Sequence, residues 1–579
     1  MKSKSALLVV VLAMAATAAA KKDKLARELQ TPADGADIDV IVTYKVVPNA
    51  AHSKRLAAHS GRVTKDLSSL KNFAVTIPAN QLDDLSNDAD VAYIAPDRTV
   101  SAFLDTPAPA VLANYAWNQG YDGSNLAVAV IDSGIRGSGK LPFKELTTWS
   151  TNSTRIVYSQ SWISDNWGTN DFFGHGTHVA GLIAGNGFNS TGSQFTETFK
   201  GIAPNVNLVN LRVLDGNGQG KDSDVIAAIQ TAISLQQKYN IRVINLSLGR
   251  PVFESYTLDP LCQAVEAAYR AGIVVVVSAG NFGRDNSFQN NGYATITAPG
   301  NDPYVITVGA MKMMGTPQRA DDLIATYSSK GPSLIDHVAK PDLVAPGNKL
   351  VSLVSGGAML GSNYPNNYVP LSAYAAGSTS KLPSSTYYVM SGTSMAAGVA
   401  SGAVALLLQA NPKMTPDQVK ARLMKTAHKT FPQYSSYTDP TTGTTYTDQY
   451  DLFTVGAGYL DLQAALADTE SFKGVATSPM VAFDPTTQSV YFVNNSFAVW
   501  GGTSDWSSFA VWGGNAFVSS NFAVWGGSSP WASFAVWGGS APWGSGTNSG
   551  FFAVWGGSTV SSSNASSADS INTLINGDN

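Results

Sequence analysis

The sequence of 579 residues contains little charge and only one cysteine. Lys, Arg, Asp and Glu make up 13% of the chain, which is about half the usual share of charged residues. The formal net charge of -4 shows no basic excess, so we expect no nucleic-acid partner. The single cysteine, Cys262, excludes an intramolecular disulfide. It lies in an amphipathic helical pattern, which predicts a small buried apolar side chain rather than a catalytic thiol.

The first residues have the order of a secretory signal peptide. Lys2 and Lys4 precede an apolar run over residues 6–16, and small residues continue to Ala20. Because the run is short for a membrane span, we predict a cleaved signal peptide over residues 1–20; a retained N-terminal anchor is the alternative. The protein is accordingly expected to be secreted and extracellular, either free or associated with a cell surface.

Residues 36–105 have the pattern of a small α+β domain. Period-two alternation predicts strands, and longer amphipathic stretches between them predict helices. Pro107 and Pro109 follow the last strand and mark a domain boundary. In chain order the predicted elements are strand 38–44, helix 52–70, strand 72–78, helix 79–87 and strand 91–96.

Between residues 110 and 468, short apolar strands alternate with amphipathic helices. This alternation predicts an α/β fold with a mostly parallel sheet that is covered by helices on both faces. Binding and catalytic sites gather beyond the carboxyl ends of the strands in such sheets. Asp132, Ser247 and Asn281 each lie at or just after such an end, so we expect the functional site there. The predicted strands are 125–132, 206–215, 242–249, 273–281 and 304–310, and the clearest helices between them are 224–238 and 261–271.

Ser394 begins a long run of small and apolar residues that ends at Asn411-Pro412, a pattern typical of a buried helix with a proline stop. A serine at such a place most often caps the helix. The other interpretation is a nucleophile, since the free N–H groups of a helix N-terminus favour a developing oxyanion.

His175 and His178 precede another small-residue helix. Their i, i+3 spacing differs from the i, i+4 spacing of the zinc helix motif, and the glutamate of that motif is absent, so we do not predict a metal pair. Asn281 follows a strand of four valines, where its side-chain amide can donate to an oxyanion.

Asp132, His175 and Ser394 occur in the chain order Asp, His, Ser, which is the order of the subtilisin triad. The sequence resembles the subtilisin-like serine proteases (subtilases, peptidase family S8) over about residues 114–466. The resemblance rests on eight motifs in the expected order and on a closing segment, GAGYLDLQAAL. The eight motifs are AVIDSGI, GHGTHVAG, NLSLG, VVVSAGN, ITVGA, YSSKGP, KPDLVAPG and SGTSMAAG.

The resemblance implies a role for each matching residue. Ser394 would be the nucleophile, His175 its general base and Asp132 the group that orients the histidine. The backbone N–H of Ser394 and the side chain of Asn281 would bind the oxyanion. The segment Ser247-Leu248-Gly249 would pair as a strand with the substrate backbone.

Thr297 departs from the family pattern, because subtilases often carry glycine at the corresponding position on the floor of the S1 pocket. A threonine there should make the pocket shallower. We therefore expect residues of medium size and apolar character at P1 to be preferred over bulky aromatic residues.

No cofactor is expected to be required for catalysis. The resemblance does imply that structural calcium is possible, because subtilases often bind it. Asp165, Asp171 and Asp215 are acidic candidates, but no loop has the spacing of a calcium site, and solvated loop acids are the simpler interpretation. We therefore assign no metal ligand from the sequence.

The α+β domain at 36–105 resembles the inhibitor-type propeptide of the same family. It predicts that the protein is made as a precursor that is inhibited by its own propeptide. Such prodomains commonly act as folding templates, since large parallel sheets have many distant contacts and fold slowly.

Residues 490–560 form an aromatic tail in which FAVWGG occurs five times, and eight of the twelve tryptophans lie there. Each repeat has the pattern of a short strand and a Gly-Gly turn. A β-stacking module and a disordered extension are both consistent with this pattern. We expect the tail to serve cell-surface attachment or self-association, and catalysis not to need it.

The sequence therefore predicts a secreted serine endopeptidase that acts on protein or peptide substrates through acyl-enzyme chemistry. Two alternatives remain. One is a catalytically silent surface or adhesive protein that uses the tail, which the intact triad residues and Asn281 disfavour. The other is a processing protease of narrow specificity.

Overall fold

The computed structural model describes residues 24–26, 29, 35–96, 107–137, 143–286, 290–316, 318–440, 442–484, 489–493, 516–518, 522–524 and 565–578. The chain divides into two compact units, residues 1–102 and residues 103–579. The predicted signal peptide over 1–20 and most of the predicted tail over 490–560 lie outside the described residues.

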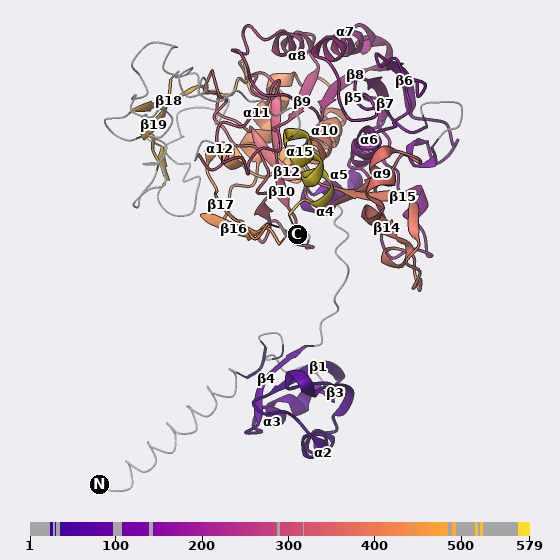
Figure 1. The fold of residues 1–579 in the computed structure, drawn as a ribbon, viewed down its shortest axis with the longest axis vertical. Helices are drawn as coiled ribbons and strands as arrows, with labels where there is room; N and C mark the ends of the chain where they lie inside the picture. Colours follow the sequence, from indigo (N-terminus) through magenta and orange to yellow (C-terminus); the bar gives the residue numbers. More distant parts are fainter. Residues whose placement is uncertain are drawn as a thin grey trace. The chain divides into compact units, whose positions relative to one another are not determined.

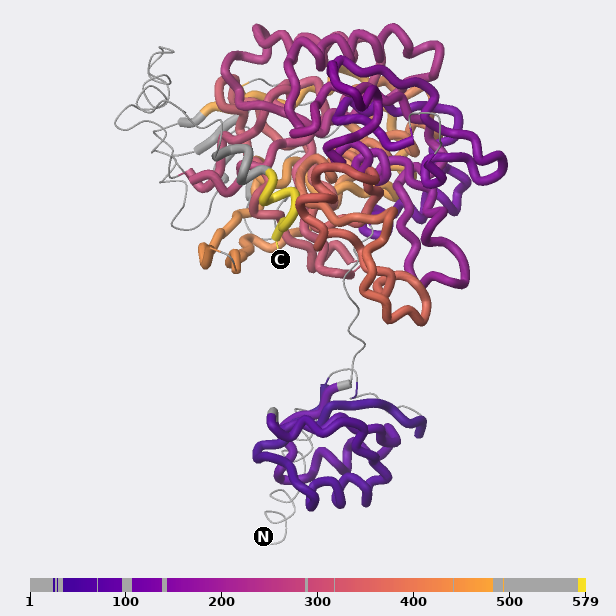
Figure 2. The backbone as a smooth tube through the Cα atoms, turned by 45° about the vertical axis from the view of Figure 1, so that its right-hand side comes forward, coloured from indigo at the N-terminus to yellow at the C-terminus, as the bar shows by residue number. Residues whose placement is uncertain are grey.

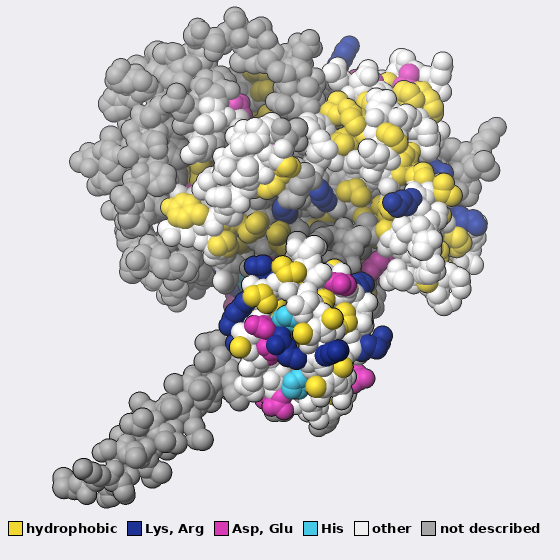
Figure 3. Space-filling model, turned by 60° about the horizontal axis from the view of Figure 1, so that its bottom comes forward, with side chains coloured by type: hydrophobic (Ala, Val, Ile, Leu, Met, Phe, Trp, Pro, Cys, Tyr) yellow, Lys and Arg dark blue, Asp and Glu magenta, His cyan; other side chains and the backbone are white. Residues whose placement is uncertain are grey.

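The N-terminal unit is a four-stranded antiparallel sheet in the order β2-β3-β1-β4, with two short helices (Figure 1). Alternate residues of β1 point into a core that includes Val40 and Val42. On the surface shown in Figure 3, basic and acidic side chains of this unit are interspersed, and Arg55 pairs with Asp88 and Asp90. The elements are β1 (Asp37–Tyr44), α2 (Ala50–Ala58), β2 (Arg62–Leu67), β3 (Asn72–Pro78), α3 (Leu82–Ser86) and β4 (Val91–Pro96).

The prediction of a helix over 52–70 is wrong for its second half. The helix α2 ends at Ala58, and β2 follows as an edge strand that pairs only with β3 among the described strands. Ser60 adopts a left-handed conformation with φ of 59°, which ends a right-handed helix. The polar edge strand RVTKDL lacks the apolar alternation that would have identified it.

The larger unit contains an eight-stranded sheet in the order β11-β10-β9-β8-β5-β7-β6, with β12 paired to β10. All of these pairs are parallel except β10 with β11. The five strands predicted in this region are confirmed. The short strands β6 and β12 and the two-residue β11 were not predicted. The strands are β5 (Ala127–Asp132), β6 (Ile156–Ser161), β7 (Asn207–Arg212), β8 (Ile241–Leu246), β9 (Val274–Ser278), β10 (Ile306–Lys312), β11 (Leu323–Ile324) and β12 (Leu343–Pro346).

Helices cover both faces of this sheet, as predicted, and β5 shows how the faces divide. Val128 and Val130 belong to the core that also holds α6 (His175–Ala184) and α10 (Thr393–Ala410). Ala129 and its neighbours at every second position belong to the core under α7 (Asp222–Tyr239) and α8 (Pro260–Arg270). Because successive strand residues point to opposite faces, one strand contributes to both cores.

Helix α10 is, among the described residues, the one helix long and apolar enough to cross a membrane. Its residues from Thr393 to Leu408 are all buried inside the unit, where it packs beside α6 and against β8, β9 and β10. These contacts identify it as the central helix of a packed core. Cys262, on α8, is also buried as predicted, and burial raises the pKa of its thiol.

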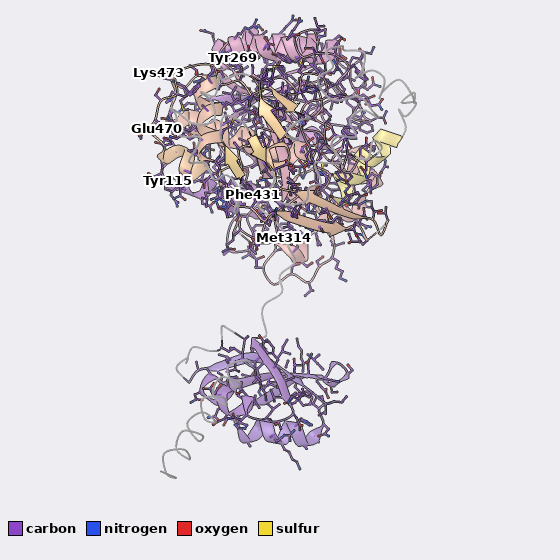
Figure 4. The ribbon with its side chains drawn as sticks, turned by 90° about the vertical axis from the view of Figure 1, so that its left-hand side faces the viewer. Tyr115, Tyr269, Met314, Phe431, Glu470 and Lys473 are labelled. Atoms are coloured by element: carbon purple, nitrogen blue, oxygen red, sulfur yellow. The ribbon has the colours of Figure 1, made fainter. Side chains whose placement is uncertain are left out.

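The larger unit, drawn as a tube in Figure 2, contains further elements besides this sheet and its helices. Tyr269 of α8, labelled in Figure 4, donates from its hydroxyl to Asp417 of α11 at 2.9 Å and so joins two surface helices. A second sheet has the order β13-β15-β14. The elements are α4 (Pro107–Ala110), α5 (Ala113–Asn118), β13 (Leu350–Leu353), α9 (Met359–Asn363), β14 (Tyr368–Pro370), β15 (Pro383–Met390), α11 (Pro416–Thr426), β16 (Tyr434–Thr438), β17 (Thr445–Gln449), α12 (Leu452–Val455), α13 (Leu462–Ala467), β18 (Val481–Asp484), β19 (Ser489–Phe492), β20 (Ala516–Val518), β21 (Phe522–Val524) and α15 (Ala565–Asn576).

Two glycines of α10 provide a matched test of its packing. A methyl group on Gly402 would lie 2.6 Å from Cβ of Ile202, whereas one on Gly398 would lie 3.5 Å from Val179, an ordinary contact. Gly402→Ala should therefore lower the free energy of unfolding by about 1–3 kcal/mol through overpacking. Gly398→Ala should leave it unchanged or raise it by up to about 1 kcal/mol. Denaturant unfolding of the two variants checks this, and equal midpoints would contradict it.

Candidate active site

Three polar residues follow three adjacent strands of the large sheet. Asp132 ends β5, Ser247 comes directly after β8, and Asn281 lies three residues beyond β9. The order β9-β8-β5 places the carboxyl ends of these parallel strands next to one another. His175 begins α6, and Ser394 is the second residue of α10. The predicted functional residues therefore come from one edge of the sheet and from two helices packed on the same face.

Asp132 and His175 form a hydrogen bond of 2.8 Å between Oδ1 and Nδ1. Both side chains are buried, and the backbone N–H of Ser133 also donates to Asp132 Oδ1 at 2.7 Å. A carboxylate in this position selects the tautomer that carries its proton on Nδ1. The Nε2 atom of His175 is then left as a proton acceptor.

Asp171 ties the loop after β5 to the start of α6. Its Oδ1 accepts from Ser133 Oγ at 2.9 Å and from Gly174 N at 2.7 Å, while Oδ2 accepts from Thr177 N at 2.8 Å. Ser133 Oγ accepts in turn from Gly176 N at 2.9 Å. This buried network fixes Asp132 and His175 relative to each other. The sequence had marked Asp171 as a calcium candidate or, more simply, as a solvated loop acid; the second interpretation is wrong, because Asp171 is buried.

Burial by itself lowers the pKa of His175, but the charge and hydrogen bond of Asp132, with the charge of Asp171, raise it further than burial lowers it. The net pKa therefore lies above the ordinary value of 6.5. Burial raises the pKa of Asp171 to about 6, although its hydrogen bonds oppose this shift. Asp171 is thus mainly ionised at neutral pH and adds to the negative field at the imidazole.

His178 has a different environment from His175. It is fully buried, and its Nε2 lies 3.1 Å from the carbonyl oxygens of Leu350 and Tyr388. Burial and the neighbouring His175 lower the pKa of His178 to about 3. It is therefore a neutral donor that holds α6 against β13 and β15.

Ser394 and Ser247 exchange two hydrogen bonds. The Ser394 hydroxyl donates to the carbonyl of Ser247 at 3.1 Å, and the Ser247 hydroxyl donates to the carbonyl of Ser394 at 2.8 Å. The N-cap of α10 is Gly392, so the interpretation of Ser394 as a helix cap is wrong. Among the described residues, Ser394 makes no hydrogen bond with His175, and its hydroxyl has to rotate away from Ser247 to reach that imidazole.

Asn281 is oriented by Thr393, the residue before Ser394. Its Oδ1 accepts from both N and Oγ1 of Thr393, at 2.9 and 3.0 Å. The Thr393 hydroxyl also accepts from Gly280 N at 3.1 Å. Since Oδ1 faces two donors, the amide NH₂ of Asn281 points away from Thr393 and remains available as a donor. The sequence contains no signal for this pairing, because the two residues are 112 positions apart.

Thr297 lies between two backbone segments that follow β8 and β9. A methyl group on Gly249 would lie 2.6 Å from Thr297 Oγ1, and one on Gly280 would lie 2.8 Å from Thr297 Cγ2. The Thr297 side chain is 3% exposed, so it fills the space between these segments. Leu248 is partly buried and packs against the core under α7 and α8.

The three acids considered as calcium candidates all have partners within the protein. Asp165 pairs with Arg212 at 2.5 Å, and Asp215 accepts from the backbone N–H groups of Asn217 and Gln219. Asp171 belongs to the network described above. In the part of the chain that the structure describes, no three His, Cys, Asp or Glu side chains converge to hold a metal ion.

Comparison with known proteins agrees with this geometry. The model of the subtilase family matches residues 123–458. Serine protease AprX of Bacillus subtilis is 35% identical over 346 residues, which cover 58% of this chain and 70% of that protein. Subtilisin E of the same species is 31% identical over 395 residues (67% and 84%), and the extracellular serine proteinase of a Thermus species is 33% identical over 384 residues (64% and 74%). The chain belongs to the subtilase family and is a serine endopeptidase.

Proposed function

We propose that this chain is a secreted serine endopeptidase that is made as a self-inhibited precursor and cleaves peptide bonds through an acyl-enzyme on Ser394. The observation that carries the proposal is the buried 2.8 Å bond between His175 and Asp132, in a site whose serine lies in the first turn of α10. A carboxylate, an imidazole and a hydroxyl in these positions are the parts of an acyl-transfer site.

In the proposed reaction the Ser394 hydroxyl turns from Ser247 to His175 and gives its proton to Nε2 as Oγ attacks the substrate carbonyl. Asp132 stabilises the imidazolium and keeps the ring in its reactive tautomer. His175 then returns the proton to the leaving amine. A water molecule repeats the sequence to release the acyl group and restore Ser394.

The oxyanion of the tetrahedral intermediate is proposed to bind the backbone N–H of Ser394 and the amide NH₂ of Asn281. The N–H of a first-turn helix residue has no acceptor within its helix, and Thr393 turns the Asn281 NH₂ outward. Two donors that are oriented before substrate arrives lower the barrier because they need no reorganisation during the reaction. Catalysis by these groups requires no cofactor; calcium remains a proposal for stability alone.

We further propose that Ser247-Leu248-Gly249 binds the substrate backbone and that Thr297 limits the depth of the S1 pocket. The polar atoms of Ser247 already contact Ser394, which supports a place beside the scissile bond. A methyl group on Gly249 or Gly280 would overlap the Thr297 side chain, which supports a place for Thr297 on the pocket floor.

The remaining parts of the proposal concern the ends of the chain. The α+β unit at residues 35–96 supports a propeptide that inhibits the enzyme until it is cleaved between about residues 96 and 109. The apolar N-terminal segment supports secretion, and the homology to an extracellular proteinase agrees with it. The FAVWGG tail is proposed to attach the enzyme to a surface or to other copies of itself.

Ser394→Ala should abolish hydrolysis of casein and of peptide substrates, and should also leave the precursor uncleaved, since the nucleophile is gone. Ser234→Ala is the matched control, because Ser234 is an exposed residue of α7 that lies outside the site. Activity assays and intact mass of protein expressed in a protease-free system check both expectations. Wild-type activity or normal processing of the folded Ser394→Ala protein would contradict the proposal.

The pH dependence follows from the pKa of His175, which is raised above 6.5. The imidazole has to be neutral to accept the Ser394 proton, so kcat/KM should fall as the pH decreases through that raised pKa. The acidic limb of the profile should therefore have its midpoint above 6.5. Measurement with an uncharged peptide anilide checks this, and a midpoint below 6.5 would contradict it.

Thr297→Gly should deepen the S1 pocket, because it removes the side chain that fills the space between Gly249 and Gly280. The ratio of kcat/KM for Phe at P1 to that for Ala at P1 should rise by about tenfold or more, the value of one or two methyl groups in an apolar pocket. Thr297→Ser is the intermediate control.

A peptide library cleaved by the wild type would also distinguish broad from narrow specificity.

A further inference from the structure

A segment that the sequence analysis did not assign lies against the peptidase unit. Helix α15 (Ala565–Asn576) and the two residues after it form what we call the strap, residues 565–578. Thr573, Leu574, Ile575 and Asp578 are all buried. Figures 1 and 2 show the strap, in yellow at the end marked C, on the surface of the larger unit. Its burial shows that it is part of the packed domain.

The Asp578 carboxylate occupies a site built from polar groups. Its Oδ1 lies 2.5 Å from Arg284 Nη2 and 2.9 Å from Thr326 Oγ1, and its Oδ2 accepts from Thr326 N at 2.8 Å. The side chain is 1% exposed. A buried carboxylate with a guanidinium and two further donors is a strong and directional contact.

The backbone of the strap also binds the Asn348 side chain and the backbone of Ser391. Asn348 donates to the carbonyl of Asp578 at 2.9 Å and accepts from its N–H at 2.8 Å. The N–H of Ser391 donates to the carbonyl of Leu574 at 2.9 Å. Gly577 has φ of 56°, and a methyl group there would overlap Ser391 Oγ and Asn348 Oδ1. Only glycine fits this close approach.

These contacts are made to the chain segments that carry the two proposed oxyanion donors. Arg284 is three residues after Asn281 on the loop that follows β9, and Ser391 is three residues before Ser394. Asn348 is the neighbour of Gly347, whose carbonyl accepts from Gly392 N at 2.7 Å. The strap thus binds both chain segments whose separation sets the geometry of the proposed oxyanion hole.

We propose that the strap is a positioning element of the active site: through Asp578 and Arg284 it holds the Asn281 loop against the segment that precedes Ser394. The proposal rests on the proposed function of Asn281 as an oxyanion donor. Asp578 touches neither substrate nor reacting atoms and acts through Arg284. The proposal also gives the strap and the FAVWGG repeats different roles: the strap positions the active site, whereas the repeats serve attachment. In the sequence, the repeats lie between β19 and the strap.

The test is a double-mutant cycle in the full chain. Asn281→Ala should lower kcat by about 10²–10³ with little change in KM. Asp578→Asn, which keeps shape but removes charge, should lower kcat by about tenfold with KM unchanged, because a small displacement of a donor acts on the transition state. In the Asn281→Ala background, Asp578→Asn should have almost no further effect, since the donor that it positions is gone.

Two matched variants and one count of active sites complete the experiment. Asn572→Ala changes an exposed residue of the same helix and should keep the wild-type kcat, whereas Gly577→Ala should reduce kcat at least as much as Asp578→Asn. Titration with a serine-directed inhibitor gives kcat per folded active site. Normal kcat per site in Asp578→Asn, or an equal loss in both backgrounds, would overturn the proposal for the strap. Wild-type kcat in Asn281→Ala would instead overturn the role of Asn281 on which it rests.

Discussion

The burial of α10 from Thr393 to Leu408 is the constraint on which the rest of the larger unit depends. This helix lies between α6 and the central strands, and its small residues allow the close approach of Val179 at Gly398 and of Ile202 at Gly402. A helix that is packed on all sides cannot slide or rotate without losing these contacts. Its first turn, and with it Ser394, therefore has one position relative to the carboxyl ends of the sheet.

Polar contacts then adjust the site that this packing locates. The Ser401 hydroxyl donates to Asn245, and Asn245 donates to Ser247, which binds Ser394. On the other side of the site, Asp171 joins the loops of Asp132 and His175. The strap adds a third set of contacts, to the loops that carry Asn281 and Ser391. The residues of the site thus have contacts with α10 and with the carboxyl ends of the strands, and the strap, which is distant in sequence, contacts the neighbouring loops.

Much of the fold follows from local pattern. The five apolar strands of the sheet and its major helices are confirmed, because each is long, strongly periodic and buried on a defined face. Two of the misses are edge strands: β2, which was taken as part of a helix, is polar, and β6 (IVYSQS) is polar in its second half. The pairing of such a strand depends on its neighbour more than on its own residues. The strap was missed because its apolar residues are few and its partners lie more than 180 residues away.

For the site, the sequence by itself determined which residues are proposed to carry the chemistry: Asp132, His175, Asn281 and Ser394 lie in motifs whose residue types and order match the subtilase family. Tertiary structure alone decided how these residues are oriented. The contacts that orient them join distant segments of the chain. They are the hydrogen bonds of Asp171, the pairing of Thr393 with Asn281, the hydrogen bond of the Ser394 hydroxyl to Ser247 and the contact between Asp578 and Arg284. Such contacts depend on where the packing of helices and strands places their side chains, and no local sequence pattern encodes the distance between residues far apart in the chain.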